Sequence, residues 1–384
     1  MMFDLLLYLG LIVALFPTKY TVSIELAISI IWVSAFVLTN RKFQMKNLTK
    51  YSVVIFILFI YSLLSYFWVL DKYYWALYNV MLFIGFSYSV WIPMSSLEKN
   101  RLRQRLQAIV EKSLLIHLLI ALFEIVSRRY FFTMNPMMIS YAQMRRNPLT
   151  FFHNTNDLAF FLLMTYLLLR IFGDSKKNRF YNFLFLPVSF VIYMTESRLV
   201  LISLIIAVLL VFVFTYFSKN FIKISIFLLS ITIVFLTFLF SDLIQNFFQY
   251  LRLSEPIRTN LMHNGFEYLK MTKYVGVGAG NILYYLQNVR LKPTYGIFSM
   301  HNWWLEILVT YGIFCFSIFT FYYLSIIRKA INLKNKWIVA WFVSFIFASI
   351  SPSNIFTTAW VWIFLAFMFT VTEKGSNNES FAHF

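Results

Sequence analysis

One stretch decides how this chain is organised: SDLIQNFFQYLRLSEPIRTNLMHNGFEYLKMTKYVGVGAGNILYYLQNVRLKPTYGIFSMHNWWLEILVTYG (residues 241–312). Strongly apolar segments flank it, and it is the longest run without a membrane-spanning pattern. It carries Arg252, Arg258, the run Gly-Val-Gly-Ala-Gly-Asn at 276–281, and His301 followed by Asn302. A polar insert that holds arginines and a histidine beside a membrane is where we expect the chemistry.

The composition indicates a membrane protein. The chain has 384 residues, of which 60% are hydrophobic and 12% are charged. Charged residues supply about a quarter of an ordinary soluble protein. Repeated apolar runs therefore predict an all-α integral membrane protein with about 12 transmembrane helices and a large helical extracytoplasmic loop between helices nine and ten. The expected spans are 3–17, 21–39, 51–70, 74–93, 107–126, 155–172, 180–195, 199–217, 223–241, 304–327, 337–350 and 355–371.

The same pattern predicts the domain organisation. We expect a single polytopic membrane domain at 1–371, which includes the extracytoplasmic loop at 242–303, and a polar cytoplasmic tail at 372–384. The first apolar run lacks a basic leader and a small-residue cleavage site, so it is interpreted as a retained span. The single cysteine, Cys315, lies within an apolar run, so no disulfide can form within the chain.

The net charge of +18 indicates the orientation in the membrane. The turns near 17–20, 71–73 and 351–354 carry only Lys19 and Lys72. Most other Lys and Arg residues lie in short loops on the opposite side, at 39–50, 94–112, 170–179, 218–223 and 328–336. Because basic loops stay in the cytoplasm, we expect these loops and both termini to be cytoplasmic.

Two long stretches then fall outside the cytoplasm, at 127–154 and at 242–303. Both are basic, which opposes the usual bias of external loops. Such a surface indicates an anionic ligand.

Two arginines are candidates for binding that anion, because a guanidinium group suits phosphate oxygens. Arg198 lies at the outer junction of two spans, where an arginine is costly unless it is paired or bound to a ligand. Its structural alternative is a snorkelling anchor or an ion pair with Glu196. Arg258 begins a segment that predicts a helix to about Lys273, and its alternative is a solvated side chain.

His301 is the sharpest single candidate. It precedes an apolar segment at the outer boundary, in Ser-Met-His-Asn-Trp-Trp-Leu-Glu at 299–306. Histidine suits general-base catalysis near neutral pH, although a lone histidine is more often structural. Glu306, five residues later, is expected either to orient the ring or to sit at the interface.

Other polar positions have plain structural alternatives. No strand precedes the glycine run 276–281, so it predicts a tight return of the loop and not a nucleotide site. Before the sixth span, Asn156 or Asp157 is expected to cap the helix or to recognise a sugar or diphosphate. His117 and Glu124 share one face of a predicted span and are functional candidates. The histidines show no metal-binding spacing.

Together these features resemble the O-antigen ligase and O-antigen polymerase family of bacterial envelope enzymes. The likeness covers nearly the whole chain, most strongly 150–315, and includes the spans and the large external loop. The matching motifs are Asn-Asp-Leu-Ala at 156–159, Ser197-Arg198, the glycine run, His301-Asn302 and Gly312 eleven residues after the histidine. The family often has leucine four residues after its loop arginine, whereas Met262 stands there after Arg258.

The resemblance implies a membrane glycosyltransferase of the bacterial cytoplasmic membrane. Such an enzyme takes a glycan from a polyprenyl diphosphate, such as undecaprenyl diphosphate, and transfers it to an acceptor hydroxyl on the extracytoplasmic face without a metal or other cofactor. Carried over, it implies that Arg198 and Arg258 hold the diphosphate and that His301 takes the hydroxyl proton. It also implies substrate contacts at Asn156, Asn281 and Asn302. Aromatic residues are expected to line the sugar path or to form an interfacial belt, namely Tyr284, Tyr285, Tyr295, Phe298, Trp303 and Trp304.

Several functions remain open. A polysaccharide polymerase for O-antigen, capsule or exopolysaccharide is the leading hypothesis, and a ligase to lipid A core or another surface acceptor uses the same chemistry. A flippase for lipid-linked oligosaccharides fits twelve spans, but transporters typically have charged residues at mid-membrane and two related halves, which this chain lacks. A membrane acyltransferase fits less well, because its donor usually enters from the cytoplasmic side.

Overall fold

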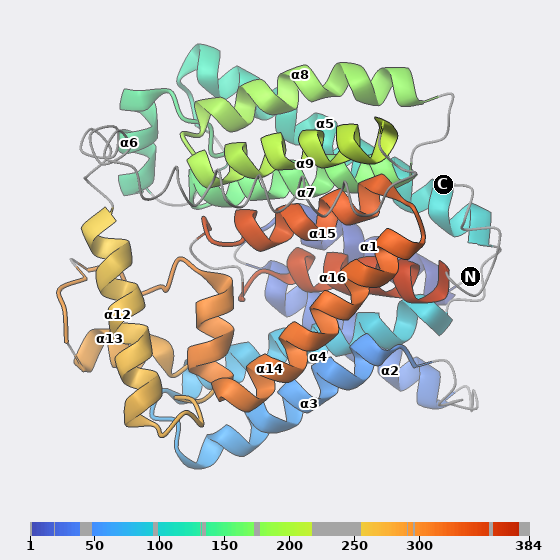
Figure 1. The fold of residues 1–384 in the computed structure, drawn as a ribbon. Coiled ribbons are helices and arrows are strands. Elements are labelled where there is room, and N and C mark those ends of the chain that lie inside the picture. Colours follow the sequence, from blue (N-terminus) through green and yellow to red (C-terminus); the bar gives the residue numbers. More distant parts are fainter. Residues whose placement is uncertain are drawn as a thin grey trace.

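The computed structural model describes residues 2–18, 20–38, 48–94, 99–130, 132, 136–172, 177–216, 255–289, 291–294, 296–352 and 356–375, and within these ranges it contains helices and no strand. Figure 1 shows most of the helices side by side in one bundle, with α12 and α13 at one end. In chain order they are α1 (Met2–Leu15), α2 (Thr21–Leu38), α3 (Lys50–Leu64), η2 (Ser65–Phe67), α4 (Lys72–Met94), α5 (Lys99–Ser127), α6 (Pro136–Arg145), α7 (Thr155–Phe172), α8 (Asn178–Met194), α9 (Arg198–Tyr216), α12 (Glu255–Met271), α13 (Ile282–Asn288), α14 (Trp303–Asn332), α15 (Lys336–Ala348) and α16 (Ala359–Gly375).

The predicted spans coincide with helices, except that the ninth, 223–241, lies outside the described residues. Five described helices are long and apolar enough to cross a membrane, namely α3 with η2, α4, α7, α9 and α14. Five shorter helices are also apolar, namely α1, α2, α8, α15 and α16. The all-helical architecture is confirmed with five candidate membrane spans among the described residues, and the count of twelve and the placement of the loop between the ninth and tenth helices stay predictions.

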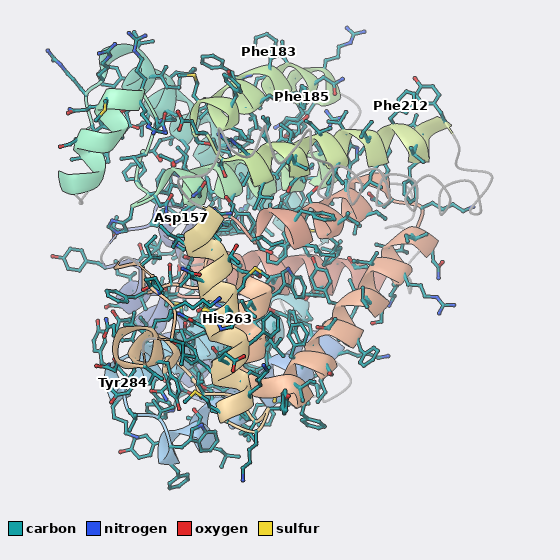
Figure 2. The ribbon with its side chains drawn as sticks, turned by 60° about the vertical axis from the view of Figure 1, so that its left-hand side comes forward. Asp157, Phe183, Phe185, Phe212, His263 and Tyr284 are labelled. Atoms are coloured by element: carbon teal, nitrogen blue, oxygen red, sulfur yellow. The ribbon has the colours of Figure 1, made fainter. Side chains whose placement is uncertain are left out.

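The outer surface of the bundle is apolar. Phe183 on α8, Phe212 on α9 and Phe321 on α14 are among many large hydrophobic side chains that are exposed. Figure 2 shows Phe183 and Phe212 on the outside of their helices. A soluble monomer rarely exposes large contiguous apolar patches, so a surface of this kind is suited to lipid tails.

Helix α7 lies at the centre of the bundle. Nearly all its side chains are buried, from Leu158 to Phe172. It packs against α5, α8, α9 and α15, and Trp341 of α15 donates its indole hydrogen bond to the Met164 carbonyl at 3.2 Å. A helix that is hydrophobic on all sides is suited to this position.

The start of α1 and the end of α16 lie at one end of the bundle, together with the ends of α7 and α14 that precede two basic stretches of sequence (Figure 1). The carboxylate of Glu373 ties this end together. It accepts hydrogen bonds from the Lys50 and Tyr51 amides at 3.0 and 3.3 Å and from the Tyr322 hydroxyl at 2.5 Å. Since α16 continues to Gly375 and Thr372 is buried, the helix extends beyond the expected end of the last span at 371.

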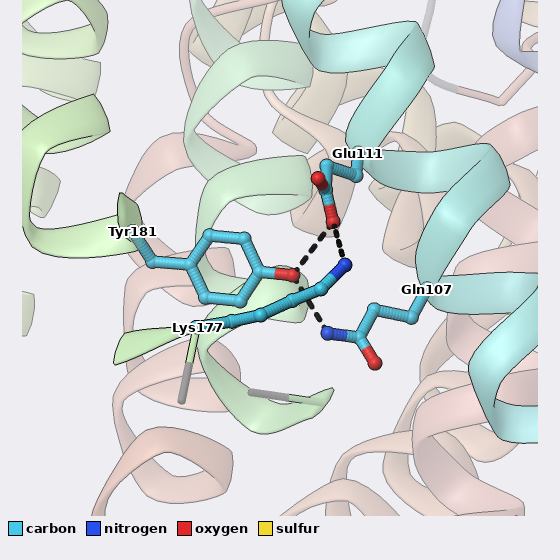
Figure 3. Close-up of polar contacts among 4 residues, drawn as sticks. All are labelled: Gln107, Glu111, Lys177 and Tyr181. Carbon is cyan, nitrogen blue, oxygen red and sulfur yellow. Dashed lines mark hydrogen bonds and ion pairs between the residues drawn. The ribbon is translucent and has the colours of Figure 1, made fainter. Parts of the chain in front are cut away.

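A second polar cluster at the same end joins α5 to α8 (Figure 3). The Glu111 carboxylate accepts from Lys177 Nζ at 2.8 Å and from the Tyr181 hydroxyl at 2.9 Å. Gln107 donates to the Tyr181 oxygen at 2.6 Å. The buried Tyr181 hydroxyl therefore both donates and accepts a hydrogen bond. The Glu373 and Glu111 clusters explain why polar residues occur in the helices near the basic loops.

Helix α14 is broken at Gly312. This glycine has φ 72° and ψ 174°, and Figure 1 shows the two halves of the helix meeting at an angle. The break frees the carbonyls of Val309 and Thr310, which accept from the amides of Val277 and Gly278 at 2.8 and 3.0 Å. The loop therefore satisfies backbone groups that would otherwise be left unpaired at the edge of a membrane.

The glycine run explains how the loop can approach so closely. Gly276, Gly278 and Gly280 all have positive φ, at 104°, 93° and 69°. A side chain at Gly276 would lie 2.5 Å from the Gly312 nitrogen, and one at Gly280 would lie 2.3 Å from the Tyr74 carbonyl carbon. The predicted tight return is confirmed, and it packs against both α14 and the start of α4.

One structural alternative from the sequence needs correction. Asn154 precedes the first residue of α7, and its Oδ1 accepts from the Asn156 amide at 2.8 Å, so Asn154 and not Asn156 stands at the cap position. His117 and Glu124, which are functional candidates from the sequence, both contact the loop before α7. Glu124 accepts from the Leu149 and Thr150 amides at 2.8 and 2.9 Å, and His117 contacts the Thr150 hydroxyl and the Leu15 carbonyl.

We expect Gly312→Ala to destabilise the protein strongly. The new Cβ would lie 2.0 Å from the Val275 carbonyl oxygen, and this backbone atom cannot move away cheaply. Gly296→Ala is the matched control, because Gly296 also has positive φ (81°) but has no atom within 4 Å of the added Cβ. Thermal unfolding in detergent should show a much larger loss for Gly312→Ala than for Gly296→Ala, whose strain is on the order of 1 kcal/mol. Equal losses would contradict the close approach.

Substitution of Glu124 should separate its hydrogen bonds from its charge. Glu124→Ala leaves two buried amides without an acceptor, and each costs about 1–3 kcal/mol. Glu124→Gln keeps an oxygen that can accept both bonds. The unfolding temperature should therefore fall clearly for the alanine variant and little for the glutamine variant. A large loss of activity in a fully stable Glu124→Gln protein would instead support a functional carboxylate.

Candidate active site

The predicted site residues gather at the end of the bundle opposite the termini. Figure 2 brings this end forward, with α12 in front and His263 on it. Four chain segments contribute, namely the turn between α8 and α9, the first turn of α12, the residues before α14, and the turn after α15. Arg252 lies outside the described residues.

His301 has a left-handed backbone, with φ 47°. Two features hold the residues that follow it. Asn302 caps α14, with its side-chain oxygen accepting from the Leu305 amide at 3.2 Å, and the Trp303 amide donates to the Ser349 carbonyl at 3.2 Å. Positive φ in a non-glycine residue is costly and is concentrated at functional sites.

The imidazole of His301 contacts the backbone of Ser351. Its ring forms a hydrogen bond to the backbone of Ser351 that raises its pKa, so the ring donates and the carbonyl accepts. The other nitrogen, Nδ1, is buried and has no hydrogen-bond partner among the described residues. A neutral ring that donates to Ser351 through its other nitrogen has a free lone pair on Nδ1. This arrangement is suited to a general base.

Arg258, in the first turn of α12, is close enough for its charge to act on His301. Burial, and then the positive charge of Arg258, lower the His301 pKa to about 4. Burial also lowers the pKa of Arg258 itself. Within the described part of the chain, no carboxylate forms an ion pair with Arg258. A half-buried cation without a counterion is suited to binding an anion.

Arg198 is linked to the His301 region by the preceding residue, Ser197. The hydroxyl of Ser197 lies 2.9 Å from the hydroxyl of Ser351, and Ser351 is the residue that holds the His301 ring. Arg198 itself begins α9 and is exposed. Glu196 pairs with Arg145 of α6 at 2.7 Å, so the expected alternative of a Glu196–Arg198 pair is wrong.

The three predicted substrate-contacting asparagines have different positions. Asn281 is 1% exposed, accepts from the Leu70 and Asp71 amides at 3.0 and 3.4 Å, and donates to the Val277 carbonyl at 3.0 Å. Asn302 caps α14, and Asn156 lies half-buried in the first turn of α7. The bonds of Asn281 and Asn302 favour a role in shaping the site, and their contact with substrate stays a prediction.

Two expectations for neighbouring residues are corrected. The Glu306 side chain hydrogen-bonds the Tyr78 hydroxyl of α4, so the group that orients His301 is Ser351 and not Glu306. Trp303 is 1% exposed and packs against Phe345, which places it in the core and not on a sugar path. Tyr295 lies outside the described residues.

Sequence reasoning missed Ser351. Its only signal was a Ser-Pro-Ser turn after an apolar segment, which is common in loops. The hydrogen bond to His301 joins residues 50 positions apart and depends on how α14 and α15 pack. Among the described residues, no cluster of His, Cys, Asp or Glu is arranged to hold a metal ion.

Two comparisons with known proteins bear on this site. Residues 183–320 match the O-Antigen ligase family, and this segment includes Arg198, Arg258 and His301. The chain is also similar to the teichuronic acid biosynthesis protein TuaE of Bacillus subtilis, with 28% identity over 247 residues. That alignment covers 57% of this chain and 50% of TuaE, so the chain spans about half the length of this relative. Through its segment 183–320, the chain is similar to the O-antigen ligase family.

Proposed function

We propose that this protein is a membrane glycosyltransferase that transfers or polymerises glycan repeats carried on a polyprenyl diphosphate, on the extracytoplasmic face of a bacterial membrane. The observation that carries the proposal is the pairing of Arg258 with His301. A cation without a described counterion lies beside a neutral imidazole whose Nδ1 is unpartnered. An anionic donor and a hydroxyl acceptor are the ligands that such a pair fits.

The reaction is a direct displacement at the anomeric carbon. The acceptor hydroxyl oxygen attacks that carbon while its proton passes to Nδ1 of His301. The bond between the anomeric carbon and the diphosphate oxygen breaks, and the electron pair leaves with the polyprenyl diphosphate. Arg258 and Arg198 stabilise the charge that develops on the leaving group. The configuration at the anomeric carbon is inverted.

Binding of the donor should strengthen the base. In the free protein, Arg258 contributes to the low pKa of His301. A diphosphate bound to Arg258 brings negative charge next to the ring, and a nearby negative charge favours the protonated imidazole. The pKa of His301 therefore rises toward the working pH when donor is bound, which improves proton transfer in the complex.

The comparisons support two versions of this chemistry. The family match is to an O-antigen ligase, whereas TuaE is named for the synthesis of a polymer, teichuronic acid. A polymerase and a ligase differ in what accumulates when the gene is deleted. Loss of a polymerase leaves single repeats attached to the acceptor, and loss of a ligase leaves lipid-linked polymer. Movement of lipid-linked glycan by the purified protein, without formation of a glycosidic bond, would instead favour a flippase.

His301→Ala should abolish most of the transfer activity. Removal of a general base typically costs 10²–10⁴-fold in rate, so we expect kcat to fall by about 100-fold or more in an assay with purified protein and lipid-linked donor. His263→Ala is the matched control, because His263 is exposed on α12 and has no assigned role. Undiminished glycan product from a stably folded His301→Ala protein would rule out the catalytic role.

Substitution of Arg258 should change both donor binding and pH dependence. Arg258→Gln should raise KM for the donor about tenfold, through loss of a charge-assisted phosphate contact. It should also move the acid limb of kcat/KM upward from about pH 4 toward the ordinary histidine value of 6.5, because a neighbouring positive charge is removed. The limb falls toward low pH, since protonated His301 cannot act as a base.

The matched variant is Arg258→Lys. It keeps the positive charge but loses the planar fork that binds phosphate through two hydrogen bonds. We expect its KM to rise and its acid limb to stay in place. An acid limb that is the same in the glutamine and lysine variants would show that Arg258 does not act on His301.

A further inference from the structure

Two hydroxyl groups link the arginine side of the site to the histidine side. Ser197 Oγ and Ser351 Oγ lie 2.9 Å apart, although the residues are 154 positions apart in the chain. Each residue is only 2% exposed. Ser197 belongs to the turn between α8 and α9, and Ser351 to the turn after α15.

The turn that contains Ser351 holds the chain segment around His301. The Ser349 carbonyl accepts from the Trp303 amide at 3.2 Å, and the Ser351 carbonyl accepts from the His301 ring. Two carbonyls in one turn therefore hold both sides of Asn302. A small displacement of this turn would move the imidazole relative to the bound donor.

This pair differs from most nearby hydroxyl groups in its partners. Ser203 and Ser349 each donate to a carbonyl in their own helix, Leu199 and Ile346. Such bonds stay within one turn of helix and fix nothing beyond it. The Ser197–Ser351 bond instead joins two separate turns, and so it fixes the position of one relative to the other.

We propose that Ser197 and Ser351 are positioning residues, whose mutual hydrogen bond holds the Ser351 carbonyl against the His301 ring and keeps Nδ1 directed at the acceptor hydroxyl. The proposal rests on the proposed function, in which His301 is the base. The hydroxyls touch no reacting atom and act only through the Ser351 carbonyl. Because Ser197 precedes Arg198, the same bond keeps a diphosphate-binding arginine in register with the base.

A purely structural role predicts a different outcome. If the bond only satisfied two buried hydroxyls, its loss would lower stability and leave the chemistry of folded molecules unchanged. If it positions His301, the loss appears in kcat and in the ring hydrogen bond of folded protein. The two effects can be measured separately.

The test uses Ser197→Ala, Ser351→Ala and the double variant, with Ser349→Ala as the matched control in the same turn. In full-length protein with ¹⁵N-labelled histidine, the ring N–H signal of His301 is assigned by its absence in His301→Ala. We expect that signal to be protected from exchange in the native protein and in Ser349→Ala. In Ser197→Ala and Ser351→Ala it should exchange faster. With lipid-linked donor, kcat of Ser197→Ala and Ser351→Ala should be about three- to tenfold lower than that of the native protein, and their KM should stay within twofold of the native value.

The double variant should be no slower than the slower single variant, because both changes remove one shared bond. Fully additive losses would overturn the proposal. So would an unchanged ring signal with unchanged kcat, or an unchanged ring signal with a lower unfolding temperature. If Ser351→Ala gives no folded protein, Ser197→Ala removes the same bond from the other side.

The outcomes separate this proposal from the proposed function. One outcome is that the ring signal exchanges faster in the serine variants while His301→Ala keeps full activity. This would mean that the bond positions the ring but that His301 is not the base. Loss of activity in His301→Ala with native behaviour of both serine variants would keep the function and remove the positioning role.

Discussion

The structure depends on a rule of the lipid environment, which is that a backbone group inside a membrane protein needs an internal partner. The break in α14 at Gly312 would leave the carbonyls of Val309 and Thr310 without their helical donors. Amides of Val277 and Gly278 replace these donors, and only a loop of glycines can approach closely enough to do so. The glycine loop at 276–281 is thereby fastened to the helix that begins beside His301.

The chemistry of the site follows from charges in a partly buried place. Arg258 and His301 are brought together without a described carboxylate between them, so the histidine stays neutral and the arginine stays unneutralised. Such a site is unfavourable when empty of anions and favourable when it holds one. Its electrostatic cost in the free protein is the counterpart of the diphosphate binding that we propose for it.

Much of this arrangement was accessible from the sequence, because apolar length and loop charge reflect the membrane directly. The helices and the tight glycine loop follow from such patterns, and the same patterns single out Arg258 and His301 as candidates. Contacts between distant segments do not. The bond between His301 and Ser351 has no local signal, and Trp303 was misplaced because a buried aromatic and an interfacial one look alike in sequence. Asn154 was missed as a cap because several capping residues stand in a row at 153–157.

The break at Gly312 also sets the depth at which the chemistry occurs. The second half of α14, residues 313–332, has a length of about 30 Å at 1.5 Å per residue, which matches the hydrocarbon thickness of a bilayer. If the second half spans the bilayer, the first half, 303–311, falls in the zone of lipid headgroups, with His301 just before its start. In the proposed reaction, a lipid-borne donor would keep its tail in the bilayer while its diphosphate lies at the level of His301, and an acceptor would reach the same level from water. The two substrates would then meet in this plane, the donor from the bilayer and the acceptor from water, and neither would need to leave its own phase.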